Sequence, residues 1–433
     1  MDKELSKIYS LFVNSKGVCI DTRKITEDEI FVALKGENFD GNKFVKQALE
    51  KGAKLAIVSN SDIKGDNVIY VEDTLKFLQD LASFHIRQLD IPVIAITGTN
   101  GKTTTKELIG KVLSSEFNVF YTKGNFNNHI GVPLSILQIT TDHEIAVIEM
   151  GASKPGDIKE LCKIADPKYG LITNIGKAHW EFFGTQENLI ATKQELFDYL
   201  NSNNGTIFYN CRLSNFIDKE IFNCKNLSYG VDRLDCNYNA SGFTHDTMFC
   251  GVEVNDTKIY SNLSGIYNAE NILAAVVVGL NFGISLLNIK YEIESYYPKN
   301  NRSQYIKTNN NKIIIDAYNA NPSSMEQSVS FFLQIPSEYH KVLILGDMLE
   351  LGKESKKEHK RILDIIVRKH SGQTFLVGSN FYKFKNMFTK HNLLFFISTD
   401  EVISFLKRNP LHNKFILLKG SRGIKLETLL EYL

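Results

Sequence analysis

The 433-residue sequence predicts an α/β protein built from three domains. The chain is too long for a single hydrophobic core, which indicates several domains. A β-branched apolar run at 93–97 leads through a glycine loop into a helical pattern, as in a nucleotide-binding parallel sheet. From about residue 303, short apolar runs alternate with helical patterns, which is typical of a doubly wound, Rossmann-like sheet. We therefore expect a small α/β domain at 1–85, a central P-loop domain at 86–302 and a C-terminal doubly wound domain at 303–433.

The composition is ordinary for a globular chain: 43% of residues are hydrophobic, 23% are charged, and the formal net charge is +1. This balance gives no electrostatic footprint for nucleic acid or for an anionic membrane. No apolar run reaches the roughly 18 residues of a membrane span, and the charged N-terminus lacks a signal-peptide core. We expect a cytoplasmic, monomeric protein with neither a nucleic-acid partner nor a membrane span.

The cysteines support the same expectation about the compartment. None belongs to a C-x-x-C pair, and no histidine cluster accompanies them. The six are Cys19, Cys162, Cys211, Cys224, Cys236 and Cys250. We expect all of them to be free thiols in a reducing cytosol.

The first 85 residues read as a small α/β unit. The apolar runs at 18–20, 30–34, 55–58 and 68–71 predict strands, and 44–51 predicts a helix ended by Gly52. Polar stretches at 21–24 and 35–41 lie between the strands. They are either ordinary turns or, because Arg23 stands beside the Thr22 hydroxyl, the holder of a phosphorylated ligand.

The strongest local signal is the loop between the strand at 93–97 and the helix that follows it. Its residues are Gly98, Thr99, Asn100, Gly101, Lys102, Thr103 and Thr104. The two glycines let backbone N–H groups point at one anion, and the new helix adds its positive N-terminal end. Lys102 can reach the terminal phosphates of a nucleotide, and the Thr103 hydroxyl can bind Mg²⁺. The alternative is a plain strand-to-helix turn, which does not need Lys-Thr-Thr after its second glycine.

Other polar residues of the central domain fall at the carboxyl ends of predicted strands, where ligands bind in open α/β sheets. Glu149 closes the strand at 145–150 and is a candidate Mg²⁺ ligand facing Thr103, with a solvated strand-end glutamate as the alternative. His179 follows the strand at 169–176, and Lys193 lies on the next helix. Taken singly, residues in such places are more often structural or solvated than catalytic.

Asparagines mark two further places in the central domain. Residues 124–131 hold three asparagines between glycines, which indicates a shaped polar loop. After a β-rich stretch at 206–263, an apolar helix begins near Gly265, with Asn268 and Asn271 on one face of its first turn. An amide in that position can cap the helix or read the edge of a base.

The C-terminal part alternates strands and helices. Strands are predicted at 312–317, 342–345, 374–377, 394–397 and 415–418, and helices from near Ser323, Glu354, Asn380 and Asp400. Polar residues gather at the strand ends, namely Asp316, Tyr318, Asn319, Asn321 and Asp347. The polar join at 300–303 could act as a hinge.

Together these motifs resemble the Mur ligases, the family that adds amino acids to the peptidoglycan precursor. The resemblance runs through all three predicted domains. It rests on 21–23, 31–36, 98–104, 124–134, 149–152, 173–176, His179, 191–193, Asn268, Asn271, 316–322, 345–352 and 419–423. The asparagine loop, the run 318–322 and the Gly-Asp-Met run 346–348 are similar to the branch that adds D-alanyl-D-alanine.

The resemblance implies an ATP-dependent amide ligase. The γ-phosphoryl group of ATP would pass to the terminal carboxylate of UDP-MurNAc-tripeptide, and the amine of D-alanyl-D-alanine would attack the acyl phosphate. The products would be UDP-MurNAc-pentapeptide, ADP and phosphate. Because two anions meet in the first step, cations and Mg²⁺ are needed around the γ-phosphate.

Roles for single residues also follow from the resemblance. The implied catalytic residues are Lys102, His179, Lys193 and Arg302. For ATP, the loop 98–104 would hold the phosphates, Asn271 the adenine, Arg302 the γ-phosphate and Asp316 the ribose. Two Mg²⁺ ions would be held by Thr103, Glu149, His179 and Lys193, the lysine as its carbamate. The UDP-sugar peptide would meet Thr22, Arg23, Asn127 and Asn128. Candidates for D-alanyl-D-alanine are Asp347, Ser421 and Arg422, and Asn319 and Asn321 are further substrate-binding candidates.

Two other functions stay open at this point. A different amino-acid-adding Mur enzyme, or a folylpolyglutamate synthase, would share the P-loop; the asparagine loop and the run 318–322 argue against it. A non-catalytic nucleotide-binding module would share the fold. A decayed relative would have lost some of the active-site residues, but all of them are present: Lys102, Thr103, Glu149, His179, Lys193 and Arg302.

Overall fold

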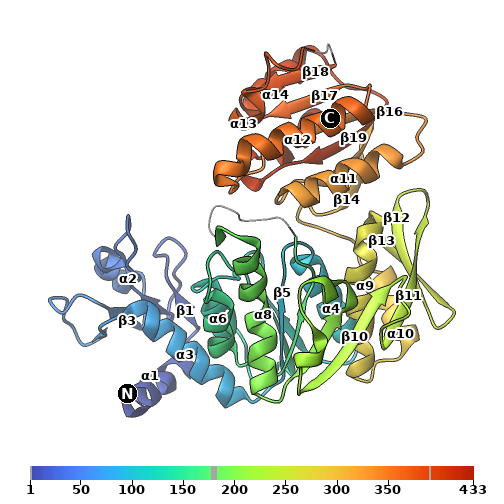
Figure 1. Cartoon of the computed structure of the whole chain (residues 1–433). Helices are drawn as coiled ribbons and strands as arrows, with labels where there is room; N and C mark the ends of the chain where they lie inside the picture. The colour runs from blue at the N-terminus through green and yellow to red at the C-terminus, as the bar shows by residue number, and fades with distance from the viewer. Residues whose placement is uncertain (1, 177–182, 390–391) are drawn as a thin grey trace.

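The computed structural model describes residues 2–176, 183–389 and 392–433. Within these ranges the strands form three separate sheets of four, nine and six strands. Figure 1 shows the sheet of the C-terminal part above the large central sheet, and the N-terminal sheet beside the central one. The mixed α/β architecture agrees with the predicted fold class, and the division at residues 85 and 302 stays a prediction.

The N-terminal sheet has the order β1-β2-β3-β4, and its strand pairs are parallel. Its elements are α1 (Asp2–Val13), β1 (Val18–Cys19), β2 (Ile30–Val32), α2 (Val45–Glu50), β3 (Leu55–Val58), β4 (Val68–Tyr70) and α3 (Thr74–Leu89).

Two helices of this unit, α1 and α3, were not predicted from the sequence. Helix α1 is amphipathic, with Ile8 and Phe12 buried one turn apart, and α3 begins at Asp73, whose carboxylate accepts from two backbone N–H groups.

The central sheet has the order β13-β12-β11-β10-β9-β8-β5-β7-β6. Its strands are β5 (Val93–Thr97), β6 (Val119–Tyr121), β7 (Ile145–Glu149), β8 (Tyr169–Ile172), β9 (Thr206–Asn210), β10 (Lys225–Val231), β11 (Tyr238–His245), β12 (Phe249–Val254) and β13 (Thr257–Ser264). Its helices are α4 (Lys102–Leu113), α5 (Gly131–Ile136), α6 (Asp157–Ala165), α8 (Gln186–Ser202), α9 (Ala269–Asn281) and α10 (Leu286–Glu294). Strand β5 runs parallel to both neighbours, β7 and β8, so the carboxyl ends of all three meet at one edge.

Two apolar layers cover the faces of the central sheet. Residues of α3, α5, α6 and α8 pack on one face, and residues of α4, α9 and α10 pack on the other. Helix α4 therefore lies against α9, and the loop before α4 emerges at the edge where β5, β7 and β8 end. This packing fixes the position of the P-loop.

The C-terminal sheet has the order β14-β15-β19-β16-β17-β18; β14 is antiparallel to its neighbour and the other pairs are parallel. Its strands are β14 (Gln304–Lys307), β15 (Asn311–Asp316), β16 (His340–Gly346), β17 (Thr374–Val377), β18 (Leu393–Phe396) and β19 (Lys414–Lys419). Its helices are α11 (Pro322–Gln334), α12 (Ser355–Lys369), α13 (Ser379–Tyr382) and α14 (Thr399–Arg408). This is the predicted doubly wound sheet with one antiparallel edge.

The cysteine prediction was wrong at two positions. Cys211 and Cys236 form a disulfide with their Cα atoms 6.4 Å apart, while Cys19, Cys162, Cys224 and Cys250 are free. The connection between β10 and β11 folds back toward the turn after β9, which joins two cysteines that no short motif links. Separately, no helix among the described residues is long and apolar enough to cross a membrane.

Candidate functional site

A cavity of about 980 Å³ lies between the central sheet and the C-terminal domain, and we call it the cleft. Its central-domain walls are the P-loop, the asparagine loop, the residues after β8 and the start of α9. Its C-terminal walls are the residues after β15 and the start of α11. The cleft thus lies where the carboxyl ends of strands from both sheets face each other, the usual ligand edge of such sheets.

Backbone geometry requires both glycines of the P-loop. Gly98 has φ +139°, and a Cβ there would lie 2.0 Å from the Thr173 hydroxyl oxygen. Gly101 has φ +80°, and a Cβ there would lie 2.5 Å from Oδ1 of Asn271. Residues after β8 hold the loop in place: the Asn100 N–H donates to Asn174 Oδ1 at 3.0 Å, and Thr173 Oγ1 donates to the Asn100 carbonyl at 2.6 Å.

Lys102 is half-buried in this loop. Its ammonium donates to the carbonyl oxygens of Gly98 at 2.8 Å and Thr99 at 3.2 Å. Burial lowers the pKa of Lys102; the Glu149 charge acts in the opposite direction, and the Arg302 charge lowers this pKa further. Arg302, at the domain junction, therefore lies close enough to Lys102 for the two positive charges to repel each other.

An oxygen-rich cluster stands beside Lys102 at the end of β7. Glu149 is 2% exposed; it accepts from Thr103 Oγ1 at 2.8 Å and from Asn127 Nδ2 at 2.8 Å. A carboxylate and a hydroxyl are the hard oxygen donors that Mg²⁺ prefers. The donor set therefore fits this metal, as the sequence suggested, whereas the predicted ligand His179 lies outside the described residues.

Lys193 projects from α8 into the same cleft. Its ammonium lies 3.4 Å from Thr97 Oγ1, at the end of β5, and the residue is 3% exposed. Burial, helped by the Lys102 charge, lowers the pKa of Lys193 to about 7. A lysine with this pKa is largely neutral just above pH 7, so its amine is available for reaction.

The asparagine pair of α9 supports the P-loop from the other side. Asn271 donates through Nδ2 to Asn268 Oδ1 at 2.9 Å and accepts from Thr105 Oγ1 at 3.1 Å. Asn268 donates to the Ser264 carbonyl and makes no capping hydrogen bond. Both residues line the cleft, and Asn271 also packs against Gly101; the contact of Asn271 with a base stays a prediction.

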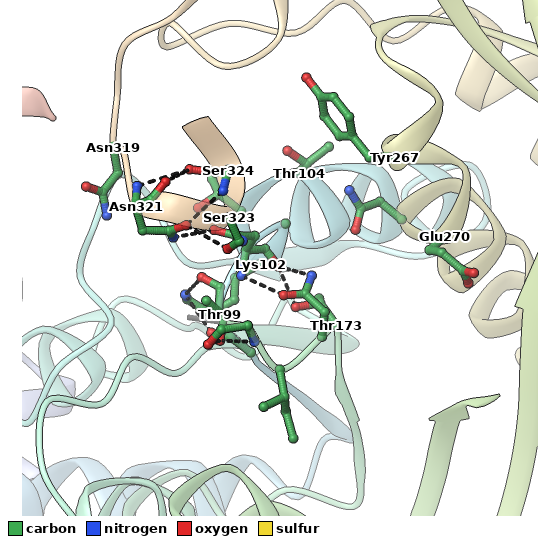
Figure 2. A pocket seen from close by; sticks show the side chains of 18 of the residues that line it. Thr99, Lys102, Thr104, Thr173, Tyr267, Glu270, Asn319, Asn321, Ser323 and Ser324 are labelled. Atoms are coloured by element: carbon green, nitrogen blue, oxygen red, sulfur yellow. Dashed lines mark hydrogen bonds between the residues drawn. The ribbon is translucent and has the colours of Figure 1, made fainter. Parts of the chain in front are cut away.

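The C-terminal domain contacts the P-loop through a ring of polar side chains. Asn321 donates to Asn100 Oδ1 at 2.7 Å, Asn100 donates to Ser323 Oγ at 3.2 Å, and Ser323 donates to Asn321 Oδ1 at 2.8 Å. Figure 2 shows Asn321 and Ser323 next to Lys102 and Thr99, with Tyr267 and Glu270 on the opposite side of the cleft. Asn321 also caps α11, so the start of that helix is held against the P-loop.

Asp316 and Arg302 reach the cleft from the domain junction, as predicted. Asp316 accepts from the Lys419 ammonium at 2.8 Å and from Ser328 Oγ at 3.0 Å. Burial raises the pKa of Asp316, but Lys419, Ser328 and Arg302 together outweigh burial, and the pKa is lowered. Asp316 therefore stays ionised and is held as an acceptor facing the cleft.

Several predicted substrate residues lie outside the cleft lining. Thr22 donates to Gln47 Oε1, and Arg23 is exposed and paired with Asp21, both in the N-terminal domain. Asp347 is 1% exposed and accepts from the backbone N–H groups of Asn380 and Phe381. Ser421 is buried, and Arg422 is exposed on the turn after β19. Of the remaining candidates, Asn127, Asn128, Asn319 and Asn321 line the cleft.

Sequence reasoning missed the parts played by Ser323 and Tyr318. Ser323 completes the polar ring on Asn100, and Tyr318 stacks on Arg302 with its ring centroid 3.7 Å from the guanidinium carbon. The Asn-Pro-Ser-Ser run was a signal for a capped helix start, but only the tertiary arrangement shows that this start lies over the P-loop.

Three family models match the chain in order. Residues 14–85 match the model described as Mur ligase family, catalytic domain. Residues 96–279 match the Mur ligase middle domain, and 301–422 match the Mur ligase, glutamate ligase domain.

Curated relatives match along nearly the full length. The UDP-N-acetylmuramoyl-tripeptide–D-alanyl-D-alanine ligase of Bacillus subtilis is 34% identical over 429 residues, covering 96% of this chain and 92% of the relative. The enzyme of the same name from Escherichia coli is 32% identical over 431 residues, covering 95% and 92%.

Solved structures agree with these matches. MurF from Acinetobacter baumannii superposes with a TM-score of 0.86 at 29% identity, covering 96% of this chain and 92% of that one. MurF from Thermotoga maritima in complex with ADP gives a TM-score of 0.83 at 27% identity, covering 98% and 97%.

The geometry around Gly101 gives a first prediction. Gly101→Ala should lower both stability and ADP affinity, because alanine at φ +80° is strained and its Cβ would collide with Asn271. Gly283→Ala is the matched control, since Gly283 has φ +84° but nothing within 4 Å of its Cβ position. Both variants should lose about 1 kcal/mol from backbone strain, and Gly101→Ala should lose about 1–3 kcal/mol more from the collision.

Urea unfolding and calorimetric titration with ADP measure the two effects. The expected result is weakened ADP binding in Gly101→Ala alone. Equal behaviour of the two variants in both measurements would show that the Asn271 contact does not shape the loop.

Proposed function

Because this chain belongs to the Mur ligase family, we propose that it is the ligase that joins D-alanyl-D-alanine to UDP-MurNAc-tripeptide at the expense of ATP. The products are UDP-MurNAc-pentapeptide, a precursor of peptidoglycan, together with ADP and phosphate. The observation that carries the proposal is the cleft itself. It brings the P-loop with Lys102, the carboxylate Glu149 and the junction residue Arg302 into one cavity lined by both domains.

The first chemical step is phosphoryl transfer from ATP to the peptide carboxylate. Two anions approach each other, so the barrier is lowered mainly by positioning and by positive charge. Lys102 exchanges its bonds to the loop carbonyls for bonds to the β- and γ-phosphates, and P-loop N–H groups bind the same phosphates. Arg302 adds a second cation from the domain junction, and Asn271 and Asp316 hold the adenine and the ribose.

The second step is attack by the amine of D-alanyl-D-alanine on the acyl phosphate. The amine nitrogen bonds to the carbonyl carbon, and the tetrahedral intermediate loses phosphate with its bridging oxygen while the nitrogen gives up a proton. Water would compete with the amine, so the reaction needs an enclosed site. The ring Asn100–Asn321–Ser323 closes the C-terminal domain onto the P-loop and limits access of water.

Mg²⁺ is proposed at Thr103 and Glu149, whose oxygens fit it, and it supplies positive charge beside the phosphates. Lys193 is proposed as a carbamate, formed when its neutral amine bonds to the carbon of CO₂ and releases a proton. The carbamate turns a cation into an anionic oxygen donor for a second Mg²⁺. His179 is proposed as a further ligand of that ion.

The substrate-binding surfaces extend the proposal. The UDP end of the sugar peptide is assigned to Thr22 and Arg23 in the N-terminal domain, with Asn127 and Asn128 nearby. Asn319 and Asn321 line the cleft, and Arg422, outside the lining, contacts the ring of Tyr318, which lines it. We assign these residues to the dipeptide. Asp347 and Ser421 act indirectly here, because Ser421 donates its N–H to the Asp347 carbonyl and both are buried. We further propose domain limits at 85 and 302, a monomer and a cytoplasmic site of action.

The proposed reaction predicts phosphate release that depends on both acceptor substrates. Purified protein with Mg-ATP should release phosphate only when UDP-MurNAc-tripeptide and D-alanyl-D-alanine are both present, and mass spectrometry should show the pentapeptide. Lys102→Ala should stay folded and lose turnover by about 10²-fold or more, because the charge that binds the transferring phosphoryl group is gone. Unchanged turnover of Lys102→Ala would contradict the phosphate assignment, and release with a dipeptide substrate and a diamino acid would point to a neighbouring Mur enzyme.

The buried Lys193 predicts a dependence on bicarbonate. Enzyme freed of CO₂ should gain activity when bicarbonate is added above pH 7, where the amine with a pKa of about 7 is mostly neutral. The gain should fall as the pH drops below 7, because the ammonium form cannot react. Lys193→Arg should stay inactive with or without bicarbonate, and Lys168→Arg, at a half-exposed lysine, should respond like the wild type. Equal activity of CO₂-free and bicarbonate-treated wild type would contradict the carbamate.

A further inference from the structure

Two arginines of the junction and the C-terminal domain share one aromatic ring. The guanidinium carbon of Arg302 lies 3.7 Å from the centroid of the Tyr318 ring, and that of Arg422 lies 5.3 Å from it. Tyr318 follows β15 and lines the cleft, and Arg422 opens the turn after β19. The strand order places β15 next to β19, so the two loops that hold these residues emerge side by side.

The ring holds Arg302 without using its hydrogen-bond donors. A guanidinium stacked face to face on an aromatic ring is attracted by the π-electrons, while its N–H groups stay free around the edge of the plane. In this structure Arg302 Nε is buried and has no hydrogen-bond partner among the described residues. A buried, charged donor without a partner is costly, which indicates that its partner comes from a ligand in the cleft.

The surrounding charges point to anionic ligands. The ion pairs found between described residues include neither Arg302 nor Arg422. Arg302 also contributes to the lowered pKa of Lys102, so these two cations lie in one electrostatic field. Asp316, the nearby acid, is already paired with Lys419. The ring therefore contacts two cations; Arg302 also acts on the Asp316 charge, and neither guanidinium forms an ion pair with a described carboxylate.

We propose that Tyr318 is a positioning residue that orients Arg302 toward the transferring phosphoryl group and Arg422 toward the carboxylate of the incoming dipeptide. The inference rests on the proposed function for the identity of both ligands. The Tyr318 ring then links the nucleotide site to the site of the amine substrate, because displacing either arginine also disturbs the contact of the other arginine with the ring. Tyr318 touches neither substrate in this scheme; it acts through the two guanidinium groups.

The test compares Tyr318→Leu with Tyr318→Phe, which keeps the ring, and with Tyr291→Leu, a control at a tyrosine that is 70% exposed on α10. Calorimetry measures the binding of ADP and of a non-hydrolysable β,γ-imido analogue of ATP. Tyr318→Leu should bind the analogue about tenfold more weakly and leave ADP binding nearly unchanged, because only the analogue carries the γ-phosphate that Arg302 meets. Tyr318→Phe and Tyr291→Leu should match the wild type.

The dipeptide side is tested with KM values. Tyr318→Leu should raise the KM for D-alanyl-D-alanine about tenfold and should lose most of the preference for this dipeptide over its C-terminal amide, which lacks the carboxylate. A double variant, Arg302→Met with Tyr318→Leu, should bind the analogue no more weakly than Arg302→Met alone, because the ring acts through the arginine.

The outcomes separate the inference from the proposed function. Equal losses for ADP and the analogue, an unchanged Tyr318→Leu, or a Tyr318→Phe as defective as Tyr318→Leu would each overturn the positioning role. If the wild type shows no dipeptide-dependent phosphate release, the proposed function fails. The comparison of ADP with the analogue still reports on the contact between Tyr318 and Arg302 in that case.

Discussion

The hydrogen bond from Asn321 to Asn100 is the contact on which the rest of the site depends. It joins the N-cap of a C-terminal helix to the P-loop of the central sheet, at 2.7 Å. Ser323 closes the ring from the same helix start. Because of this contact, residues after β15 face the carboxyl ends of β5, β7 and β8, and a cleft with walls from two domains results. Together with the hydrogen bond from Ser264 Oγ to the Ser303 carbonyl, it fixes Arg302 and Asp316 relative to the phosphate-binding loop.

The cleft brings three cations near one another among several carboxylates, and this arrangement has a chemical consequence. Lys102, Lys193 and Arg302 all line the cleft, and burial lowers the pKa of both lysines. The Arg302 charge lowers the pKa of Lys102, and the Lys102 charge lowers that of Lys193, while nearby carboxylates act in the opposite direction. Anions bound between the cations reduce the remaining repulsion. A triphosphate and a peptide carboxylate are such anions. The repulsion between these cations is reduced when the substrates bind.

The sequence was a good guide wherever function and local pattern coincide. The P-loop was placed correctly because the strand Val93–Thr97, the glycines and the helix start all lie within a dozen residues. Glu149 was paired with Thr103 because both lie at carboxyl ends of a parallel sheet, and the hydrogen bond between them confirms that they meet. Local rules sufficed in both cases.

Features that depend on tertiary contacts were harder to predict from the sequence. Asp347 was expected at the dipeptide, yet its carboxylate is buried against backbone N–H groups, which strand-end position alone cannot reveal. The disulfide between Cys211 and Cys236 depends on how the β10–β11 connection folds back. The stack of Arg302 and Arg422 on Tyr318 joins residues that are separated by more than a hundred positions. Neither periodicity nor spacing carries that information.

The central claim is that this cleft passes a phosphoryl group from ATP to a carboxylate before the amide forms. The most direct measurement uses UDP-MurNAc-tripeptide with both oxygens of the terminal carboxylate replaced by ¹⁸O, turned over with Mg-ATP and D-alanyl-D-alanine. Mass analysis of the released phosphate should find one ¹⁸O atom, because the bridging oxygen of the acyl phosphate leaves with phosphorus. Phosphate free of ¹⁸O, released together with pentapeptide, would contradict the account.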